Sequence, residues 1–565
     1  MKNTLTACFI LAMLTASQAA AQKHQLDADD LFADEQIVDI RIDLPEASWD
    51  DIRNQTRSFV DSLQYELAES PFTNVKADIS INGVEIKDVA VRKKGFLGSL
   101  NNQRPSLKIK FNEYVDQSPI KGLDRLTLNN NNQDPGRMCQ YLSYRMFNRS
   151  GTVSPRCSFA KVTVNGKYLG IYSNVEAVRK PFLKAGFGSS SGSIFEGTVT
   201  DFFPSWVQRF EAKTKKSDPA VVRKIAELLS EDDLDLEELG KWVDLPAFMK
   251  FWAMESLIGF WDGYCNNQNN YFIYQRPDNN KIYFIPWGVD SSYAKTMPLP
   301  PFRVRPRSVH SKAILPNKLY RIPETQRMYQ QALMELLDTY WNEEELIDEI
   351  NRAEALLEGE IMESNRGFSR GVRNYRRFVE SRRKEIVGEF EEGPPELRSR
   401  ESLPAYFSQA GEATVTFNTG WFKRVPKNIN EISSVQLDLI MEGEAVELEN
   451  VIAYAEQSKS PAPFAPPSTT DTAIIVSGTR KSDGKTIMLA TSLPTKNFSP
   501  TEGKEVQMNN GVFMVNNQFM SPGGAMRMIG GTAILKEAGP TEGEPVSGTL
   551  KLKILELKGG KPVGQ

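Results

Sequence analysis

Residues 260–274 read FWDGYCNNQNNYFIY, and residues 282–290, a short polar stretch later, read IYFIPWGVD. A helical pattern ends at the start of the first segment and gives way to a polar loop. The alternating aromatic and aliphatic residues that follow predict a β-hairpin. Asp262 lies in the loop before the hairpin and Asp290 lies just after it. The segment therefore presents two carboxylates on either side of one hairpin.

This order of side chains matches the requirements of phosphoryl transfer. One carboxylate orients or deprotonates the acceptor hydroxyl, and another, usually with an amide oxygen, holds the magnesium that bridges the phosphates. Asp262 fits the first role and Asp290 the second. Asn267 follows Asp262 at the spacing of the metal-binding Asn in protein kinases, and Asn270, directly before the hairpin, is an equal candidate. In an arbitrary protein, an Asp-Gly turn and a solvated Asn-rich loop would explain the same residues.

The chain before and after this segment changes from strands to helices. Residues 75–91 and 159–175 each alternate around an Asn-Gly pair, the strongest short signal for a hairpin. From residue 218 the pattern becomes helical, and residues 324–390 are almost wholly helical. Strands first and helices later predict an α+β fold in which an N-terminal sheet lobe joins a C-terminal helical lobe.

A different pattern follows the helices. The helical periodicity stops near Gly393, and short alternating runs continue to the end of the chain. We predict a linker at residues 393–404 and a separate all-β, sandwich-like domain over residues 405–565. Within it, residues 458–470 are rich in Pro and Ser and are expected to form an exposed loop.

The N-terminus has the pattern of a secretory signal peptide. Lys2 precedes an apolar stretch at residues 5–14, and three alanines precede Gln22. Cleavage is expected after Ala21, with residues 22–35 as an N-terminal segment, so the protein is expected to be periplasmic, on the cell surface or secreted. No later run approaches the roughly 20 apolar residues of a membrane helix, and we expect no membrane span.

Composition limits the classes of chemistry. Lys and Arg number 68 against 72 Asp and Glu, and this balance gives no sign of a nucleic-acid partner. Two histidines are too few for a multi-histidine metal site, so the chemistry must rest on carboxylates, lysines and arginines. Cys139 and Cys157 are the preferred disulfide pair in an oxidising compartment, and buried packing of the cysteines as free thiols is the alternative.

The loop at Asp262 and the Ile-Pro-Trp-x-aliphatic-Asp pattern ending at Asp290 resemble the most diagnostic region of the spore coat protein H (CotH) kinase family. Three further segments are similar to family motifs: VNGKYLGIY at residues 164–172, SLKIKF at residues 106–111 and the helix around YRRFVESR at residues 375–382. The resemblance covers about residues 36–392. Many members carry Asp where this chain has Gly288, which implies weaker metal binding.

The resemblance implies an exported, atypical protein kinase with a two-lobed protein-kinase-like fold. Such a protein would bind ATP with Mg²⁺ or Mn²⁺ and phosphorylate Ser or Thr of secreted or surface proteins, with Asp262 in the catalytic role and Asp290 binding the metal.

The sheet lobe is expected to contact the phosphates. Residues 92–99, RKKGFLGS, offer Arg92 and Lys94 beside two glycines, although an ordinary loop between strands is the alternative. Lys108 is the better lysine, because its strand can fix its direction. Glu176 either contacts nucleotide between the lobes or forms a structural ion pair.

A second class of function competes with the enzyme. ATP is scarce outside the cytoplasm, and Gly288 departs from the family pattern, so the chain could be a weak or inactive kinase that serves as a surface structural or adhesion protein. Its β domain would then bind a surface or glycan partner, an expectation that rests on fold analogy alone.

Overall fold

The computed structural model describes residues 25–34, 36–55, 57, 63, 69–96, 99–294, 307–362, 367–397, 400–457, 471–516, 518 and 527–559. The predicted signal peptide and the Pro- and Ser-rich loop lie outside the described residues. Two compact units are present, one comprising residues 1–55, 71–95 and 99–401 and the other residues 56–70, 96–98 and 402–565. Along the described chain, no helix has both the length and the apolar composition of a membrane span.

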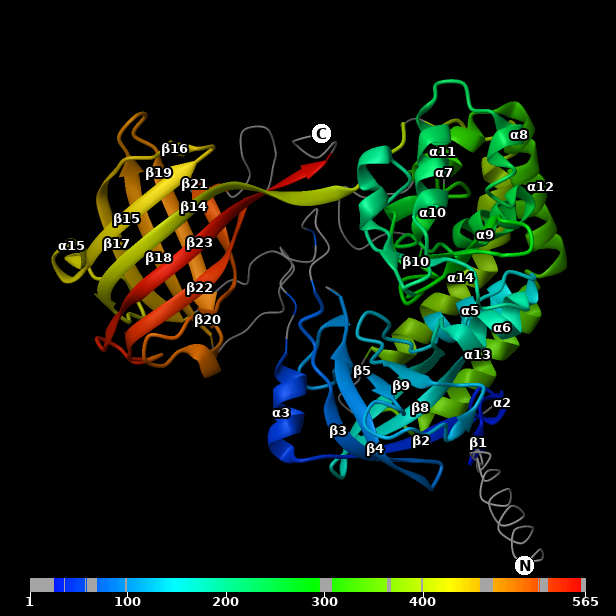
Figure 1. Cartoon of the computed structure of the whole chain (residues 1–565), viewed down its shortest axis with the longest axis horizontal. Helices are drawn as coiled ribbons and strands as arrows, with labels where there is room; N and C mark the ends of the chain where they lie inside the picture. The colour runs from blue at the N-terminus through cyan, green and yellow to red at the C-terminus, as the bar shows by residue number, and fades with distance from the viewer. Residues whose placement is uncertain are drawn as a thin grey trace, which may run out of the picture. The chain divides into compact units, whose positions relative to one another are not determined.

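A closed seven-stranded barrel opens the first unit (Figure 1). In barrel order its strands are β2 (Ile37–Asp43), β3 (Val75–Ile81), β4 (Val84–Lys94), β5 (Ser106–Lys110), β7 (Arg125–Asn129), β9 (Lys167–Glu176) and β8 (Cys157–Val164). Asn82 and Asn165 have φ of 49° and 48° at the two predicted hairpin turns, a conformation that Asn adopts more readily than most residues. Local turn chemistry thus sets these two hairpins.

Short elements surround the barrel: β1 (Leu26–Asp27), α2 (Ala28–Leu31), α3 (Glu46–Asn54), β6 (Ile120–Lys121), α5 (Cys139–Arg149) and α6 (Lys180–Phe187). Phe159, Ile171 and Val175 of the barrel pack into the same apolar core as helix α5. The barrel is therefore joined to the rest of its unit by continuous hydrophobic packing.

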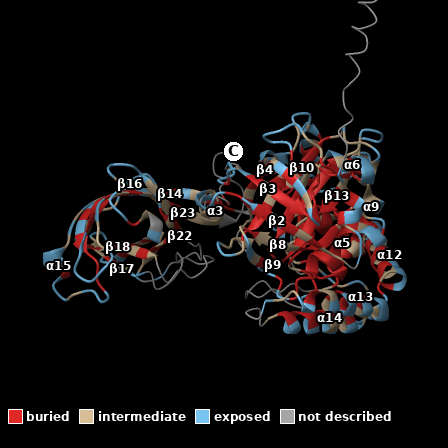
Figure 2. Cartoon of the chain, turned by 90° about the horizontal axis from the view of Figure 1, so that it is seen from below, coloured by how far each residue is buried: buried red, intermediate tan, exposed pale blue. Residues whose placement is uncertain are grey.

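Helices and one small sheet make up the rest of this unit. The sheet has the order β11 (Glu211–Ala212), β10 (Ile194–Gly197), β12 (Tyr271–Gln275) and β13 (Ile282–Pro286). The helices are η2 (Pro204–Arg209), α7 (Ala220–Ser230), α8 (Leu236–Leu239), α9 (Leu245–Leu257), α10 (Tyr264–Asn267), α11 (Ile314–Tyr320), α12 (Pro323–Thr339), α13 (Glu343–Glu358) and α14 (Phe368–Glu389). Buried residues concentrate along their shared interior (Figure 2).

The second unit contains one ten-stranded sheet. Its strands are β14 (Ala405–Gly420), β15 (Ser434–Met441), β16 (Glu444–Ala445), β17 (Leu448–Gln457), β18 (Thr472–Arg480), β19 (Thr486–Leu493), β20 (Val506–Gln507), β21 (Asn509–Val515), β22 (Arg527–Ala538) and β23 (Pro545–Gly559), with the short helices α15 (Ile429–Ile432) and η3 (Thr495–Asn497). The prediction of a C-terminal β domain is confirmed.

The predicted pair of packed sheets is instead a single curled sheet. Beyond the end of β14, Trp421 bridges Ala455 in β17, the last strand in the sheet order. Long twisted strands coil a wide sheet until its ends approach, and β14 and β23 are 16 and 15 residues long.

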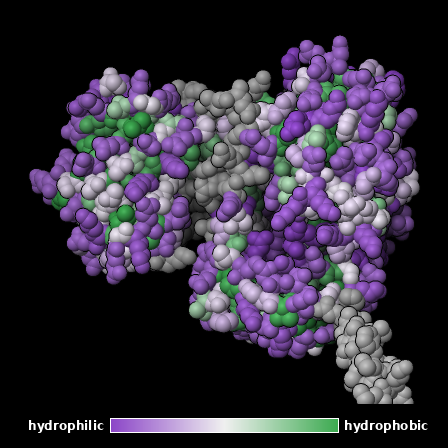
Figure 3. Space-filling view, viewed as in Figure 1, coloured by the Kyte–Doolittle hydropathy of each residue, from purple (hydrophilic) through white to green (hydrophobic). Residues whose placement is uncertain are grey.

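On the face shown in Figure 3, the described surface is mainly hydrophilic, with apolar residues in small patches.

The predicted Cys139–Cys157 disulfide is not formed. The three cysteines in the described part of the chain are buried free thiols. Cys139, at the start of α5, donates from Sγ to the carbonyl of Ser292 at 3.3 Å. Cys157, at the start of β8, contacts the carbonyl of Ser158 at 3.8 Å. Each thiol is thus satisfied separately, which corresponds to the packing alternative.

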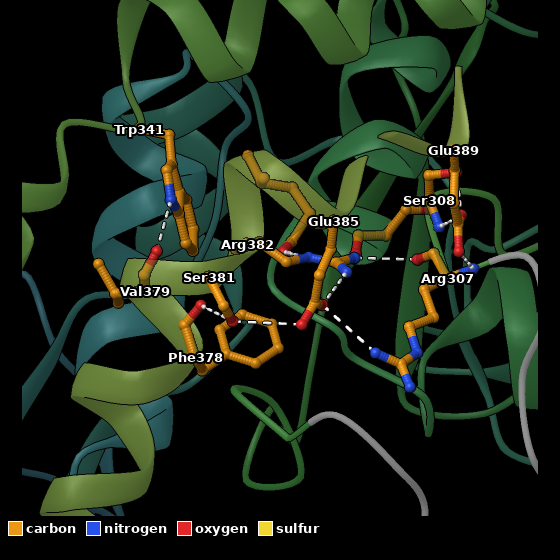
Figure 4. A network of polar contacts seen from close by, with 11 residues as sticks. Arg307, Ser308, Trp341, Phe378, Val379, Ser381, Arg382, Glu385 and Glu389 are labelled. Carbon is orange, nitrogen blue, oxygen red and sulfur yellow. Dashed lines mark hydrogen bonds and ion pairs between the residues drawn. The ribbon is translucent and has the colours of Figure 1, made fainter. Parts of the chain in front are cut away.

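Arg382 of helix α14 bonds to the chain before Asp262 and after Asp290 (Figure 4). This side chain is 2% exposed and donates to the carbonyls of Ser256, Leu257 and Arg307. Ser256 and Leu257 end α9, which leads to Asp262, and Arg307 follows the Asp290 loop. One buried guanidinium therefore ties these two stretches together.

Replacing Arg382 with Met is expected to lower the free energy of unfolding by about 3 kcal/mol, because two buried carbonyls and one part-buried carbonyl lose a charged donor. Urea denaturation measures the loss. The matched control is Arg377→Met, an exposed position on the same helix, where less than about 0.5 kcal/mol is expected. Equal losses for the two variants would contradict this role of Arg382.

Candidate active site

Asp262 is held by a set of side-chain amides. Its Oδ1 accepts hydrogen bonds from Asn267 Nδ2 at 2.6 Å and Asn269 Nδ2 at 3.2 Å, and its Oδ2 accepts one from Asn270 Nδ2 at 2.8 Å. Burial raises the pKa of Asp262 to about 6, and the three amides act in the opposite direction. Since a carboxylate oxygen offers two lone pairs, Oδ1 is filled and Oδ2 keeps one acceptor site.

Asp290 lies within electrostatic range of Asp262. Its side chain is buried, with 8% of the residue exposed. Burial, together with the negative charge of Asp262, raises the pKa of Asp290 to about 7, and the positive charge of Lys94 acts in the opposite direction. The two predicted carboxylates and one predicted lysine thus form a single cluster.

The hairpin β12–β13 explains how residues far apart in sequence meet. Tyr271 pairs with Pro286 at the open end of the hairpin, and the carbonyl of Asn270 accepts the N–H of Trp287 at 3.0 Å. Asn270 therefore lies beside Gly288, the second residue before Asp290. Gly288 has φ of 56°, and a Cβ added there would lie 2.7 Å from Oδ1 of Asn270.

Three cations share one face of barrel strands β4 and β5. Arg92 pairs directly across from Lys108, and Lys94 lies two residues further along β4, on the same face as Arg92. Lys93 faces the other side, where it donates to the carbonyl of Arg53 at 2.7 Å. Burial lowers the pKa of Lys108 to about 7, and also lowers that of Lys94. Lys94 also feels the negative charge of Asp290, and Lys108 that of Glu196; that these cations contact phosphates stays a prediction.

Glu196, on β10, completes the cluster and was missed in the sequence. It pairs with Lys213 at 2.6 Å. Burial favours its neutral form, but the charges of Lys213, Lys108 and Lys94 hold the pKa of Glu196 below its ordinary value. The available signal was a charged residue inside the apolar strand Ile194–Gly197.

Glu176 forms an ion pair with Arg156. Its carboxylate is 5% exposed and accepts Nη2 of Arg156 at 2.9 Å and Nε of Arg156 at 3.0 Å. The structure thus contains the ion pair that the sequence left open as one of two roles. In the glycine-containing loop, Gly95 has φ of 143°, and residues 97 and 98 lie outside the described residues.

Asp290 and Asn270 carry oxygen donors of the kind that a hard divalent cation prefers. Within the described ranges, no group of three or more His, Cys, Asp or Glu side chains could hold a metal ion. Mg²⁺ is commonly bound by one or two carboxylates together with substrate phosphates. Asp290 with the amide oxygen of Asn270 fits that pattern. Asn269, which the sequence analysis did not single out, has a buried Oδ1 without a hydrogen-bond partner.

A family comparison covers the whole of this cluster. Residues 91–386, more than half of the chain, match the model of the family described as CotH kinase protein. The chain belongs to the CotH kinase protein family. The resemblance inferred from the Asp262 and Asp290 motifs is confirmed.

Relatives in this family come from a bacterium and a fungus. Inner spore coat protein H of Bacillus subtilis is 27% identical over 198 residues, which is 32% of this chain and 53% of the relative. Invasin CotH3 of Rhizopus delemar is 22% identical over 188 residues, 30% of this chain and 31% of the relative. The matches thus span about half or less of these relatives.

The comparison with solved structures includes a kinase. The proinflammatory kinase CtkA of Helicobacter pylori aligns with 52% of this chain and 92% of that chain, at 9% identity and a TM-score of 0.26. This score is too low to define a shared fold.

The space beside Gly288 of this CotH-family chain is occupied by Asn270. Gly288→Ala is expected to lower the free energy of unfolding by about 1–2 kcal/mol, because the new Cβ meets the amide of Asn270 in a left-handed backbone conformation. Thermal unfolding measures the loss. Gly166→Ala, a turn glycine with φ of 76° and open space around it, is the control for the backbone cost alone. A loss no larger than the control would contradict the contact.

Proposed function

We propose that this chain is an exported, atypical protein kinase that transfers the γ-phosphate of ATP to Ser or Thr of secreted or surface proteins. The observation that carries the proposal is the buried Asp290, on which the charges of Asp262 and Lys94 both act, beside the amide-held carboxylate of Asp262. Family membership supports it. In this proposal, the barrel and the helical part act as the two lobes of a kinase-like fold.

Asp262 receives the proton of the acceptor hydroxyl. Its Oδ2 keeps an acceptor site while the amides fix the direction of the carboxylate. A pKa near 6 leaves the group ionised at neutral pH yet basic enough to assist. The acceptor oxygen forms a bond to the γ-phosphorus, the bond from that phosphorus to the bridging oxygen of ADP breaks, and ADP leaves.

Asp290 and Asn270 would hold Mg²⁺ or Mn²⁺. Bound there with the nucleotide, the ion would neutralise negative charge on the phosphates. Lys94, Lys108 and Arg92 supply positive charge from the barrel face, and the negative charge of Glu196 interacts with both lysines. The residues of this chain thus bind and orient the nucleotide from two sides.

Binding of ATP at pH 8 is expected to take up close to one proton in the parent protein. Lys108 is mostly neutral at that pH, because burial lowers its pKa to about 7, and a phosphate anion raises the pKa of a neighbouring amine. Calorimetry in two buffers of different ionisation enthalpy measures the uptake. Lys108→Met should remove it, whereas Lys110→Met, on the same strand, should keep it. Uptake that survives in Lys108→Met would contradict the assignment.

The proposal is tested by incubating the mature protein with γ-labelled ATP, Mg²⁺ or Mn²⁺ and a mixture of exported proteins. Label on Ser or Thr of the protein or of an exported protein supports it. No label, together with no nucleotide binding, would overturn it.

A second candidate is a surface structural or adhesion protein that keeps this fold with little or no transferase activity. Gly288, in place of the acidic residue that the motif favours, supports this alternative, and so do the names of two relatives, a spore coat protein and an invasin. Nucleotide binding without transfer, combined with binding to a surface partner through the β unit, would favour it over the kinase.

A further inference from the structure

Two further buried carboxylates, Asp201 and Glu255, accept hydrogen bonds from the loop that follows Asp262. Asp201, between β10 and η2, has no solvent exposure. Its Oδ1 accepts the N–H of Phe202 at 2.8 Å and the hydroxyl of Tyr264 at 2.9 Å. Its Oδ2 accepts Nε2 of Gln268 at 2.9 Å and the N–H of Ile314 at 2.8 Å. Four donors therefore fill the four acceptor sites of one carboxylate.

Three of these donors come from elements that flank the site. Tyr264 begins α10 and Gln268 directly follows it, so Asp201 holds both ends of the short helix between Asp262 and Asn270. Ile314 begins α11, the first helix after the Asp290 loop. The chain on either side of the site is thus anchored to one buried group.

The backbone after α10 is strained, and Asp201 bonds to the side chain of one of the strained residues, Gln268. Gln268 and Asn270 have φ of 53° and 54°, a region that a long side chain such as Gln rarely occupies. Such conformations cost about 1–3 kcal/mol and persist only where the surroundings enforce them. The backbone N–H of Thr200 reinforces the hold by donating to the carbonyl of Gln268 at 2.9 Å.

Glu255 holds the start of the same loop. It is buried in α9, and its two oxygens accept the N–H of Tyr264 at 3.0 Å and of Cys265 at 2.8 Å. A Cβ on Gly263 would lie 2.3 Å from Oε1 of Glu255, so the residue after Asp262 must be glycine for this contact to form.

We propose that Asp201 and Glu255 are positioning residues that hold the loop of residues 262–270 in the geometry required for phosphoryl transfer. This inference rests on the function proposed above. The two carboxylates touch neither the acceptor nor the nucleotide and act through the loop. An amide cannot replace either one, since it offers a single acceptor oxygen and presents N–H groups to existing donors.

The experiment compares Asp201→Asn and Glu255→Gln with Glu349→Gln in the mature protein. Glu349 is also a buried carboxylate, but it pairs with Arg145 and Arg149 away from the loop. Amide hydrogen exchange is measured for peptides covering residues 260–271 and for peptides covering strands β4 and β5, and kcat is measured together with nucleotide affinity.

In Asp201→Asn and Glu255→Gln, loop exchange should rise by about tenfold or more while exchange in β4 and β5 is unchanged. The value of kcat should fall by about 100-fold, with a much smaller change in nucleotide affinity. Glu349→Gln should lower thermal stability without a selective effect on the loop.

Loop exchange at the parent level, or a rise shared equally with the barrel strands as for a general loss of stability, would overturn the inference. If the parent itself transfers no phosphate, that result counts against the proposed function, and the exchange measurement still decides whether the carboxylates hold the loop.

Discussion

Asp262→Asn should lower kcat by about 10³-fold or more while leaving nucleotide affinity nearly unchanged. The amide has the size of the carboxylate but cannot accept a proton, and positioned general bases contribute about 10²–10⁴-fold. The new side chain keeps a single acceptor oxygen, so its N–H group would face at least one of the three asparagine amides that now donate to the carboxylate. Steady-state kinetics and calorimetry separate the two parameters.

The matched control for this variant lies at the other end of the helix that leads to Asp262. Asp244 caps the N-terminus of α9 by accepting the N–H of Ala247 at 3.1 Å, and Asn is an equally good cap. The other oxygen of Asp244 accepts the hydroxyl of Tyr283 at 2.7 Å, and this hydroxyl can instead accept from the new amide, so Asp244→Asn should keep kcat with at most a small loss of stability. Transfer by Asp262→Asn at the rate of the parent would remove Asp262 from the reaction.

Asp290→Asn is the second variant with a large expected effect. We expect loss of metal-dependent nucleotide binding and a fall in kcat/KM of more than about 100-fold, since even residues that only support a metal ligand typically contribute 10–100-fold. Without metal, the variant should unfold at a higher temperature than the parent at pH 8. The reason is that a buried, like-charged carboxylate is replaced by a neutral group.

Thermal unfolding with and without Mg²⁺ and ATP tests both parts of this expectation. The parent should gain stability when metal and nucleotide are added together, and Asp290→Asn should gain none. Asp134→Asn is unsuitable as a control because the Asp134 charge also acts on Asp290. Equal stabilisation of parent and variant by metal and nucleotide would contradict the assigned role.

Local patterns explain the parts of the fold and site that the sequence predicted. The Asn-Gly turns define two barrel hairpins because the turn residues themselves favour the required backbone. Asp262, Asn270 and Asp290 could be selected because one hairpin joins them. The basic residues could be selected from the sequence for a similar reason, since Lys108 and Arg92 lie on adjacent strands and pair directly.

The missed features depend on contacts between segments that are distant in the chain. Glu196 and Asp201 reach the site because β10 pairs with β12, a register that no local pattern encodes. Cys139 and Cys157 were paired on compartment chemistry, whereas each thiol has a separate partner. The curled C-terminal sheet shows the same alternation of buried and exposed residues as a sandwich, and only its strand pairing distinguishes the two.

The most direct test of the metal–nucleotide site is anomalous diffraction from crystals of the mature protein grown with Mn²⁺ and a non-hydrolysable ATP analogue. The Mn²⁺ peak should lie within coordination distance of both the carboxylate of Asp290 and the amide oxygen of Asn270. The phosphates should lie between this ion on one side and the two lysines, Lys94 and Lys108, on the other. An empty site at Asp290, or nucleotide bound elsewhere on the chain, would contradict the account.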